Sequence, residues 1–361
     1  MNSRRLLILT IAALVAIGAG VWLAGRQTTS GSTAGPGALY PELKGQLNSV
    51  SSVNIYKAGD ARIVELKKQG ESWTVTERDN YHADAGKVGK LLIALADAKL
   101  SEEKTSNPEQ YATLGVEDTK GTGATSLRIE LGGTPKPVNL IVGKQGAGAR
   151  SNYVRRAGEP QSWLINTTID TSSTAEAWLR KDIIDVSADR MQSAKVETKG
   201  AKPYTAAKAA RADSNFAVEG LPRGKALSSP AAANSVATAL TGLSLSDVRA
   251  ASAFQSTPPA AHATFKTFDG LIVDADGWVQ DEKHYVALRT SFDAAQAERF
   301  KIATPPAEEK KDDPAPEPPK PAAPNVAEDA KKVAAKVNGW VYEIPDYKYE
   351  GLFKPADQLI K

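Results

Sequence analysis

The 361-residue chain contains no cysteine, only three histidines and only two methionines. Without cysteine, the protein has no disulfide, no thiolate metal ligand, no cysteine nucleophile and no N-terminal cysteine for lipid attachment. Aromatic residues are also scarce at 6%, but the hydrophobic content of 41% and the charged content of 24% are typical of globular proteins. The chain must therefore be held together by its core alone. Its length allows two ordinary domains or one duplicated domain.

An excess of charge of one sign is missing as well. The 45 basic and 42 acidic residues leave a net charge of +3. A protein that binds nucleic acid usually carries a broad basic surface, which this composition does not provide. We therefore expect no nucleic-acid partner.

Recognisable catalytic motifs are absent. His82, His262 and His284 lie far apart and lack the spacing of a metal site, and the chain contains no G-x-S-x-G nucleophile motif. The glycine-rich stretch 143–148 fits neither phosphate-loop pattern and precedes a predicted strand rather than a helix, so we predict a hairpin loop. The sequence thus predicts no catalytic residue, no cofactor and no metal site.

Two Asp-Gly pairs favour turns. Asp274-Ala275-Asp276-Gly277 is similar to the start of a calcium loop, but Tyr285 stands where such a loop needs its bidentate glutamate. Because apolar stretches flank both pairs, we expect tight turns at Asp276-Gly277 and at Asp269-Gly270.

A hydrophobic run from Leu6 to Gly25 contains no charged residue. As a helix it is about 30 Å long, which matches the hydrocarbon core of a bilayer. Two arginines precede the run and only Arg26 follows it, so the positive-inside rule predicts a cytoplasmic N-terminus and a periplasmic body. A cleaved signal peptide is the alternative, although the run is long and the cleavage site poor. The residues expected to form this single-pass inner-membrane anchor include Arg4, Arg5, Leu6, Leu9, Leu14, Val21 and Trp22.

The pattern of apolar residues predicts an α+β fold made of two tandem repeats, each a strand-rich unit with one packed helix. We expect a cytoplasmic stub and anchor at 1–26, a tether at 27–47, and repeats at 48–186 and 187–361. In the first repeat, strands are predicted at 53–56, 63–66, 73–76, 127–131, 138–142, 153–156 and 162–165. In the second, they are predicted at 195–197, 204–207, 216–218, 264–268, 271–273, 278–279, 285–288 and 340–344. A chance similarity between two α+β halves is the alternative to duplication.

One helix is predicted in each repeat. In the first, Asp84 can cap a helix with an apolar stripe of Val88, Leu91, Leu92 and Leu95. In the second, Ser229-Pro230 can start a helix with a stripe of Val236, Leu240 and Leu243.

The proline-rich insert 303–336 cannot join a sheet, because proline lacks a backbone donor. It is expected to be a solvated excursion that ends in a short helix from Val326 to Val337. It acts either as a spacer, which we favour, or as a polyproline II segment that binds a partner.

Aromatic residues supply the remaining candidates. The strand tryptophans Trp73, Trp163, Trp278 and Trp340 are expected in the core, with glycan or partner binding as the alternative. Tyr342, Tyr347 and Tyr349 follow a less regular pattern and are the candidates for a partner contact.

Short motifs spread over the body carry a resemblance to a known family. In the first half they are Tyr40-Pro41-Glu42-Leu43, Trp73-Thr74-Val75, Asp84-Ala85-Gly86-Lys87-Val88, Asn107-Pro108, Leu114-Gly115-Val116, Tyr153-Val154-Arg155-Arg156 and Gln161-Ser162-Trp163-Leu164. In the second half they are Thr267-Phe268-Asp269-Gly270-Leu271 and Gly339-Trp340-Val341-Tyr342. With these motifs the chain resembles the bacterial envelope family catalogued as domain of unknown function 4340. The resemblance implies a membrane-anchored α+β protein, often encoded near ABC-transporter components of the gliding-motility auxiliary type, with no known activity.

Three function classes follow. The first is a non-enzymatic accessory or scaffold protein that binds a membrane or periplasmic partner, which the resemblance suggests is an ABC-type transporter component. The second is a module that binds a ligand or an envelope polymer in a cleft between the repeats. The third is a hydrolase whose residues form no visible motif.

Overall fold

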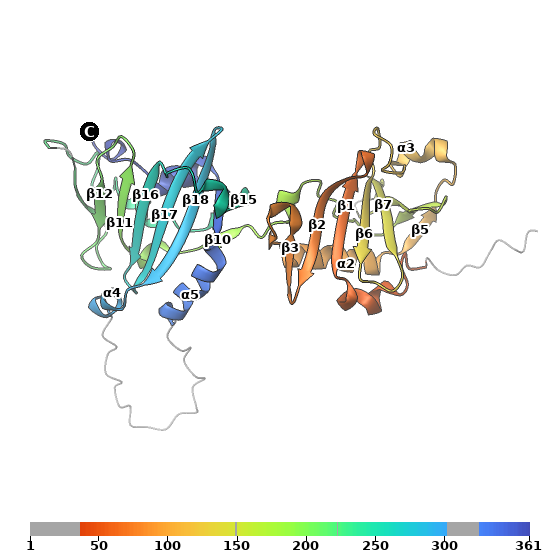
Figure 1. The fold of residues 1–361 in the computed structure, drawn as a ribbon, viewed down its shortest axis with the longest axis horizontal. Helices are drawn as coiled ribbons and strands as arrows, with labels where there is room; N and C mark the ends of the chain where they lie inside the picture. Colours follow the sequence, from red (N-terminus) through yellow and green to blue (C-terminus); the bar gives the residue numbers. More distant parts are fainter. Residues whose placement is uncertain (1–36, 149, 222, 302–324) are drawn as a thin grey trace, which may run out of the picture.

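The computed structural model describes residues 37–148, 150–221, 223–301 and 325–361 (Figure 1). The protein is α+β and is dominated by two antiparallel sheets of nine and eight strands, one in each half of the chain. The predicted anchor at 6–25 and most of the proline-rich insert lie outside the described residues. Within the described ranges, no helix is both long and apolar enough to cross a bilayer.

The first sheet has the strand order β4-β3-β2-β1-β6-β7-β8-β9-β5. Its strands are β1 Ser52–Lys57, β2 Ala61–Gln69, β3 Ser72–Val75, β4 Tyr81–His82, β5 Leu100–Glu103, β6 Leu127–Gly132, β7 Val138–Gln145, β8 Asn152–Arg156 and β9 Ser162–Ile165. Alternate residues point to opposite faces, so Ile55 stands between Val64 and Ile129 in the register and all three are fully buried. This alternation defines a buried inner face and a polar outer face.

The second sheet has the strand order β13-β12-β11-β16-β17-β18-β19-β15. Its strands are β11 Met191–Thr198, β12 Tyr204–Ala207, β13 Ala217–Glu219, β15 Asp247–Ala250, β16 Ala261–Thr267, β17 Leu271–Gln280, β18 Lys283–Phe292 and β19 Trp340–Ile344. A separate pair, β10 Asp182–Ile184 and β14 Leu243–Ser244, links the two halves of the chain. Apart from β4, the two sheets share one strand order, with β1 in the place of β11 and β5 in the place of β15.

A loop folds over the outer face of each sheet at the same point of the topology. In the first half the loop between β5 and β6 contains α3 (Tyr111–Leu114) and packs Tyr111 and Val116 on Ile141. In the second half the loop between β15 and β16 packs Phe254 on Trp278 and other side chains of that face. Each sheet therefore has a small apolar cluster outside the main core.

Helix α2 (Ala85–Asp97) covers the inner face of the first sheet (Figure 1). The Asp84 carboxylate accepts a hydrogen bond from Lys87 N at 2.9 Å, which satisfies one of the free N–H groups of the first turn. The stripe of Val88, Leu91, Leu92 and Leu95 is buried. Both the helix and its inward face are confirmed as predicted.

The predicted helix from Ser229 is wrong, because this stretch forms turns and a short 3-10 helix at Asn234–Thr238. Its Asn, Ser and Thr residues have low helix propensity, since their side chains compete for backbone groups. The Asn234 side chain accepts a hydrogen bond from Phe216 N and donates one to Ser214 O. Leu240 and Leu243 are nevertheless buried, as expected.

The turn predicted at Asp276-Gly277 is also wrong, because β17 runs without a break from Leu271 to Gln280. A glycine is present at position 277 because a Cβ atom there would lie 2.6 Å from the Phe353 ring. The turn at Asp269-Gly270 is confirmed, with Gly270 at a φ of 90° that favours glycine.

The end of the insert packs on the protein. Helix α5 is confirmed at Val326–Val337, but its Ala330 and Val337 are buried, and Thr290 Oγ1 donates a hydrogen bond to Ala330 O at 2.9 Å. Lys336 pairs with Asp182 of β10. The prediction of a solvated excursion is therefore wrong for residues 325–336, because the apolar face of α5 packs against β17 and β18.

The two halves meet at a junction built around two side chains. Arg78 pairs with Glu176 and, at 2.6 Å, with Asp247, which starts β15. The Tyr81 ring packs edge-on against Trp340 at 4.9 Å and Tyr342 at 6.1 Å between centroids. One continuous buried cluster runs through both halves as a result.

Candidate functional site

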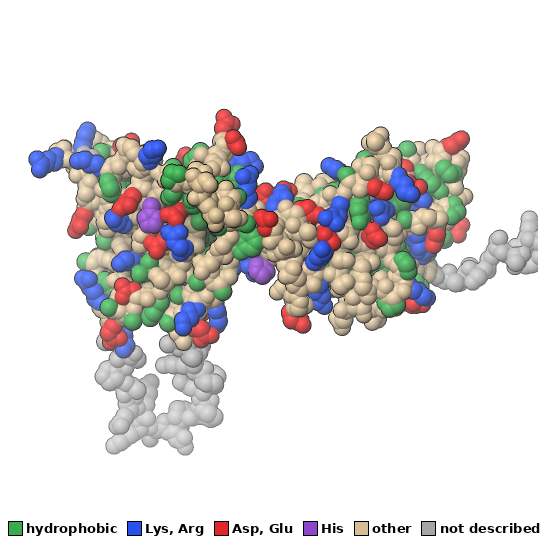
Figure 2. Space-filling model, in the orientation of Figure 1, with side chains coloured by type: hydrophobic (Ala, Val, Ile, Leu, Met, Phe, Trp, Pro, Cys, Tyr) green, Lys and Arg blue, Asp and Glu red, His purple; other side chains and the backbone are tan. Residues whose placement is uncertain are grey.

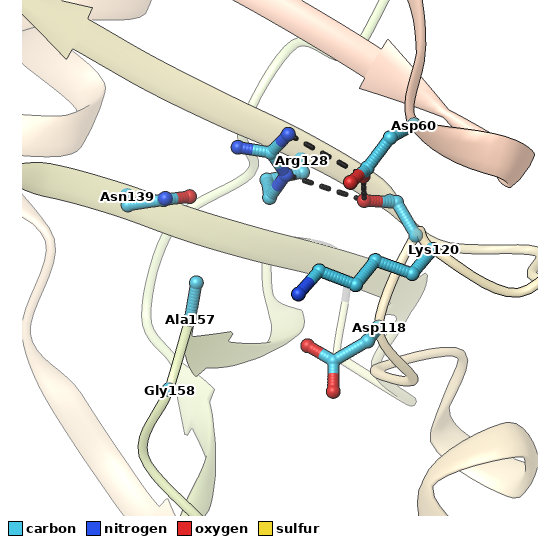
Figure 3. A pocket seen from close by; sticks show the side chains of 8 residues that line it. Asp60, Asp118, Lys120, Arg128, Asn139, Ala157 and Gly158 are labelled. Carbon is cyan, nitrogen blue, oxygen red and sulfur yellow. Dashed lines mark hydrogen bonds and ion pairs between the residues drawn. The ribbon is translucent and has the colours of Figure 1, made fainter.

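A cleft of about 440 Å³ opens on the outer face of the first sheet (Figure 3). Five segments build it: the short turn Ala58–Asp60 between β1 and β2, the loop before β6, the strands β6 and β7, and the turn after β8. Its lining residues are Asp60, Asp118, Thr119, Lys120, Arg128, Asn139, Ala157 and Gly158. Rigid strands thus carry one wall and loops carry the other, which is a common arrangement for binding sites.

Arg128 fixes the loop wall to the strands. Its Nε donates to Thr119 Oγ1 at 3.2 Å and its Nη2 donates to Asp60 Oδ1 at 3.4 Å. Thr119 Oγ1 in turn donates to Asp60 at 2.5 Å, and this bond holds the pKa of Asp60 below its usual value. The guanidinium also stacks on Tyr56 at 4.1 Å and pairs with Glu130 at 3.3 Å. Arg128 is therefore held in one position before any ligand arrives.

A second arginine, Arg155, supports the floor beneath the loop. Its side chain is only 3% exposed, and its Nη2 lies 3.0 Å from Asp118 Oδ1. Its Nε donates to Val116 O at 2.8 Å and its Nη1 to Glu159 O at 3.0 Å. Each carboxylate of the cleft thus has an arginine as its partner.

Two polar groups of the cleft have no partner. Lys120 Nζ makes no hydrogen bond or ion pair with any described residue, and Figure 3 shows it pointing toward the side where Asn139 and Ala157 lie. The Asn139 side-chain oxygen is buried without a hydrogen-bond partner. The cleft offers donors for binding rather than a nucleophile paired with a base.

A second cleft, of about 580 Å³, lies at the junction of the halves. Its lining residues are Glu71, Ser72, Trp73, His82, Ala83, Asp84, Ala85, Arg180, Lys181 and Asp182. Burial, together with the nearby cations Arg180 and Lys336, lowers the pKa of His82. Burial likewise lowers the pKa of Lys181. Acidic and basic side chains are interspersed over both halves on the face shown in Figure 2, so recognition at either cleft is local.

A family model described as "Domain of unknown function (DUF4340)" matches residues 73–264, which is 192 of the 361 residues. The chain belongs to the DUF4340 family. The resemblance expected from the sequence is thereby confirmed, and the match includes every lining residue of the outer-face cleft except Asp60, as well as most of the junction. No curated protein and no solved structure matches this DUF4340 chain significantly.

The three histidines of the DUF4340 protein lie in separate surroundings. His82 is at the junction, His262 Nδ1 lies 2.7 Å from Asp276 on the outer face of the second sheet, and His284 Nδ1 lies 2.8 Å from Asp346. Among the described residues, no group of three or more His, Asp or Glu side chains is arranged to hold a metal ion.

The aromatic candidates divide by burial. Of the four strand tryptophans, Trp278 is buried at 8% exposure, while Trp73, Trp163 and Trp340 are half-buried and pack against the core. A fully buried tryptophan, Trp178, was missed because it follows a run of polar residues and lies outside any strand pattern.

The three tyrosines proposed as partner contacts also differ. Tyr342 is fully buried at the junction and Tyr349 is 9% exposed, so neither is available to a partner. Both lie in the core because their rings pack against other aromatic rings, and burial raises the pKa of Tyr349 to about 12. Tyr347 is 67% exposed and remains a candidate.

Tyr347 borders a groove of about 340 Å³ beside α6 (Asp346–Leu352). The other lining residues are small or polar: Ser235, Thr238, Ala239, Thr241, Lys348 and Gly351. Lys348 Nζ donates to Thr241 O at 2.5 Å, which fixes one side of the groove. The groove combines an exposed aromatic ring with hydroxyl groups.

Proposed function

We propose that this DUF4340 protein is a non-enzymatic accessory protein of the bacterial inner membrane whose body binds a protein partner. In this proposal, residues 6–25 form a single-pass anchor in the lipid bilayer with the N-terminus in the cytoplasm and the body in the periplasm. The partner is a membrane or periplasmic protein, and the family resemblance suggests a component of an ABC-type transporter. The hydrophobic run and its flanking arginines support the topology.

The observation that carries the proposal is the preformed outer-face cleft. Asp60, Thr119 and Arg128 lock its loop wall to the sheet through mutual hydrogen bonds, so little ordering remains to oppose binding. Since the two arginines are already paired with carboxylates, the arrangement suits recognition better than proton transfer. A rigid recess with a few fixed polar groups is the general form of a binding site.

The shared strand order supports a further part of the proposal, that residues 48–186 and 187–361 are tandem repeats. The copies would then have diverged in function. The first copy carries the cleft lined by Lys120 and Arg128, and the second carries the groove beside Tyr347.

A crosslinking experiment tests the partner hypothesis. A photo-reactive amino acid replaces Lys120 in the full chain in native membranes, and a matched variant carries it at Lys90, which is exposed on α2. We expect an adduct at position 120 that is absent at position 90 and that weakens when Arg128→Gln disturbs the cleft. Equal labelling at both positions, or no adduct at either, would contradict the proposal.

The topology has its own test. A reporter that is active only in the cytoplasm, fused after Lys361, should be silent in the proposed orientation. An active reporter would place the body in the cytoplasm and overturn the proposed localisation.

A second candidate function, binding of an envelope polymer, is favoured by Tyr347 and its groove. A sugar ring has an apolar face that stacks on an aromatic ring and hydroxyl groups that bond with Ser235 and Thr238. The full chain should then sediment with purified peptidoglycan sacculi, with Tyr347→Phe retaining binding and Tyr347→Ala losing it. Equal sedimentation of both variants would exclude this site.

A further inference from the structure

The outer-face cleft contains a positive charge and an amide that the protein itself does not satisfy. Arg128 pairs with both Asp60 and Glu130, and the buried Arg155 pairs with Asp118. Lys120 is exposed and forms no direct ion pair with a described residue, although it lies close enough to Asp60 to interact with it electrostatically. The Lys120 amine is thus the cation of the cleft that has no direct partner among the described residues.

Asn139 adds a second donor on the same side. Its side-chain oxygen is buried and has no hydrogen-bond partner. Its Nδ2 also makes no hydrogen bond, but this atom is not buried. The NH2 group is consequently the end that faces the opening. The backbone of Asn139 is fixed, because its carbonyl accepts bonds from Tyr40 Oη at 3.2 Å and Ala157 N at 3.0 Å.

The geometry points to a carboxylate as the group that this cleft binds, with Lys120 Nζ and Asn139 Nδ2 as its donors. The inference rests on the proposed function and names the chemical group that the partner presents there. A cation would have to compete with the arginines that already pair with Asp60 and Asp118. A neutral group would forgo the charge-assisted hydrogen bond that the Lys120 ammonium can donate, which is stronger than a neutral one.

Succinate and its uncharged analogue succinamide have similar shapes, so they separate charge from shape. Saturation-transfer NMR on the full chain in detergent micelles measures weak binding of both at constant ionic strength. We expect saturable binding of succinate but not of succinamide. Lys120→Gln should weaken succinate binding about tenfold, equivalent to about 1.4 kcal/mol, while the matched variant Lys90→Gln should leave it unchanged. Equal binding of both compounds, or no effect of Lys120→Gln, would overturn the inference.

Two short peptides identify the source of the carboxylate by competing with succinate. Gly-Glu-Gly blocked at both ends offers only a side-chain carboxylate, whereas acetyl-Gly-Gly-Gly with a free end offers only a terminal one. Displacement by either supports a protein carboxylate, and displacement by neither overturns it. If crosslinking at position 120 succeeds while succinate fails to bind, the partner proposal stands and the carboxylate is wrong. Failure of both removes both proposals.

Discussion

Arg78 offers a direct test of how the two halves are held together. It is the only cation paired with both Glu176 and Asp247 among the described residues, and the three side chains are 23%, 34% and 21% exposed. Replacing it by methionine keeps most of the side-chain volume and removes the charge. Two half-buried carboxylates then lose their direct ion-pair partner, and Lys181 and Lys283 remain as the cations near Asp247.

The cost follows from these contacts. A charge-assisted hydrogen bond contributes about 1.5–3 kcal/mol, and partial exposure moves the value toward the lower end. With two such bonds lost, we expect Arg78→Met to reduce the free energy of unfolding by about 2–4 kcal/mol. Because the lost contact between Arg78 and Asp247 joins the two halves, the transition should also become less cooperative.

Urea unfolding followed by tryptophan fluorescence measures both effects. Arg62→Met is the matched control, because Arg62 pairs with Glu65 and Glu77 but its side chain is 43% exposed, so its loss should cost less than about 1 kcal/mol. Adding Asp247→Asn to Arg78→Met should recover part of the loss by removing an unpaired carboxylate. If Arg78→Met and Arg62→Met cost the same, the junction is not held by this cluster.

Three further predictions concern stability. Gly277→Ala should reduce the free energy of unfolding by about 1–3 kcal/mol, because its Cβ would overlap the Phe353 ring. Gly89→Ala in α2, which has open space around it, should instead increase that free energy by about 0.5–1 kcal/mol. Equal effects in urea titrations would refute the packing explanation. The pKa of His82 is lowered in the folded state, so the unfolded chain takes up the proton first as the pH falls. The contribution of His82 to the free energy of unfolding is therefore complete above about pH 6.5 and is lost as the pH falls below that value. His82→Asn should therefore reduce the loss of stability between pH 7 and pH 5, and an unchanged acid dependence would contradict this. Val337→Ala should reduce the free energy of unfolding by about 2 kcal/mol, because that side chain is fully buried. Shortening 303–323 should change the melting temperature little, since the free energy of loop closure varies by only about 0.6 kcal/mol per doubling of length.

The predictions from sequence succeeded where the cause of a structure is local. Asp84 and the stripe of α2 lie within 13 residues of each other, and the short strands show alternation or β-rich composition in their own residues. The strand at Trp340–Ile344 was placed correctly for the same reason.

The wrong predictions concern residues whose structure depends on packing against a distant segment of the chain. An Asp-Gly pair normally favours a turn, but Gly277 stays in β17 because Tyr349 and Phe353, more than 70 residues later, pack on it. Tyr342 looked irregular in the sequence, yet it is buried because Tyr81 from the other half packs on its ring.

The outer-face cleft could be predicted only in part. Tyr56 and Arg128 alternate with buried neighbours, so sequence alone could have assigned them to an outer face. The loop that brings Asp118, Thr119 and Lys120 over that face leaves no periodic signal, because it belongs to no helix or strand. Its position depends on apolar contacts such as that of Val116 with Ile141.

The position of β19 determines when the second half can fold during synthesis. This strand is made near the end of the chain, after the proline-rich insert, yet it lies between β18 and β15 inside the sheet. Until residues 340–344 leave the ribosome, β15 has no neighbour to pair with, although it was synthesised about 90 residues earlier. Such long-range pairing is slow to form. A chain that stops before Trp340 would lose an internal strand rather than an edge, so a late stop codon should leave the second half unfolded and open to proteolysis.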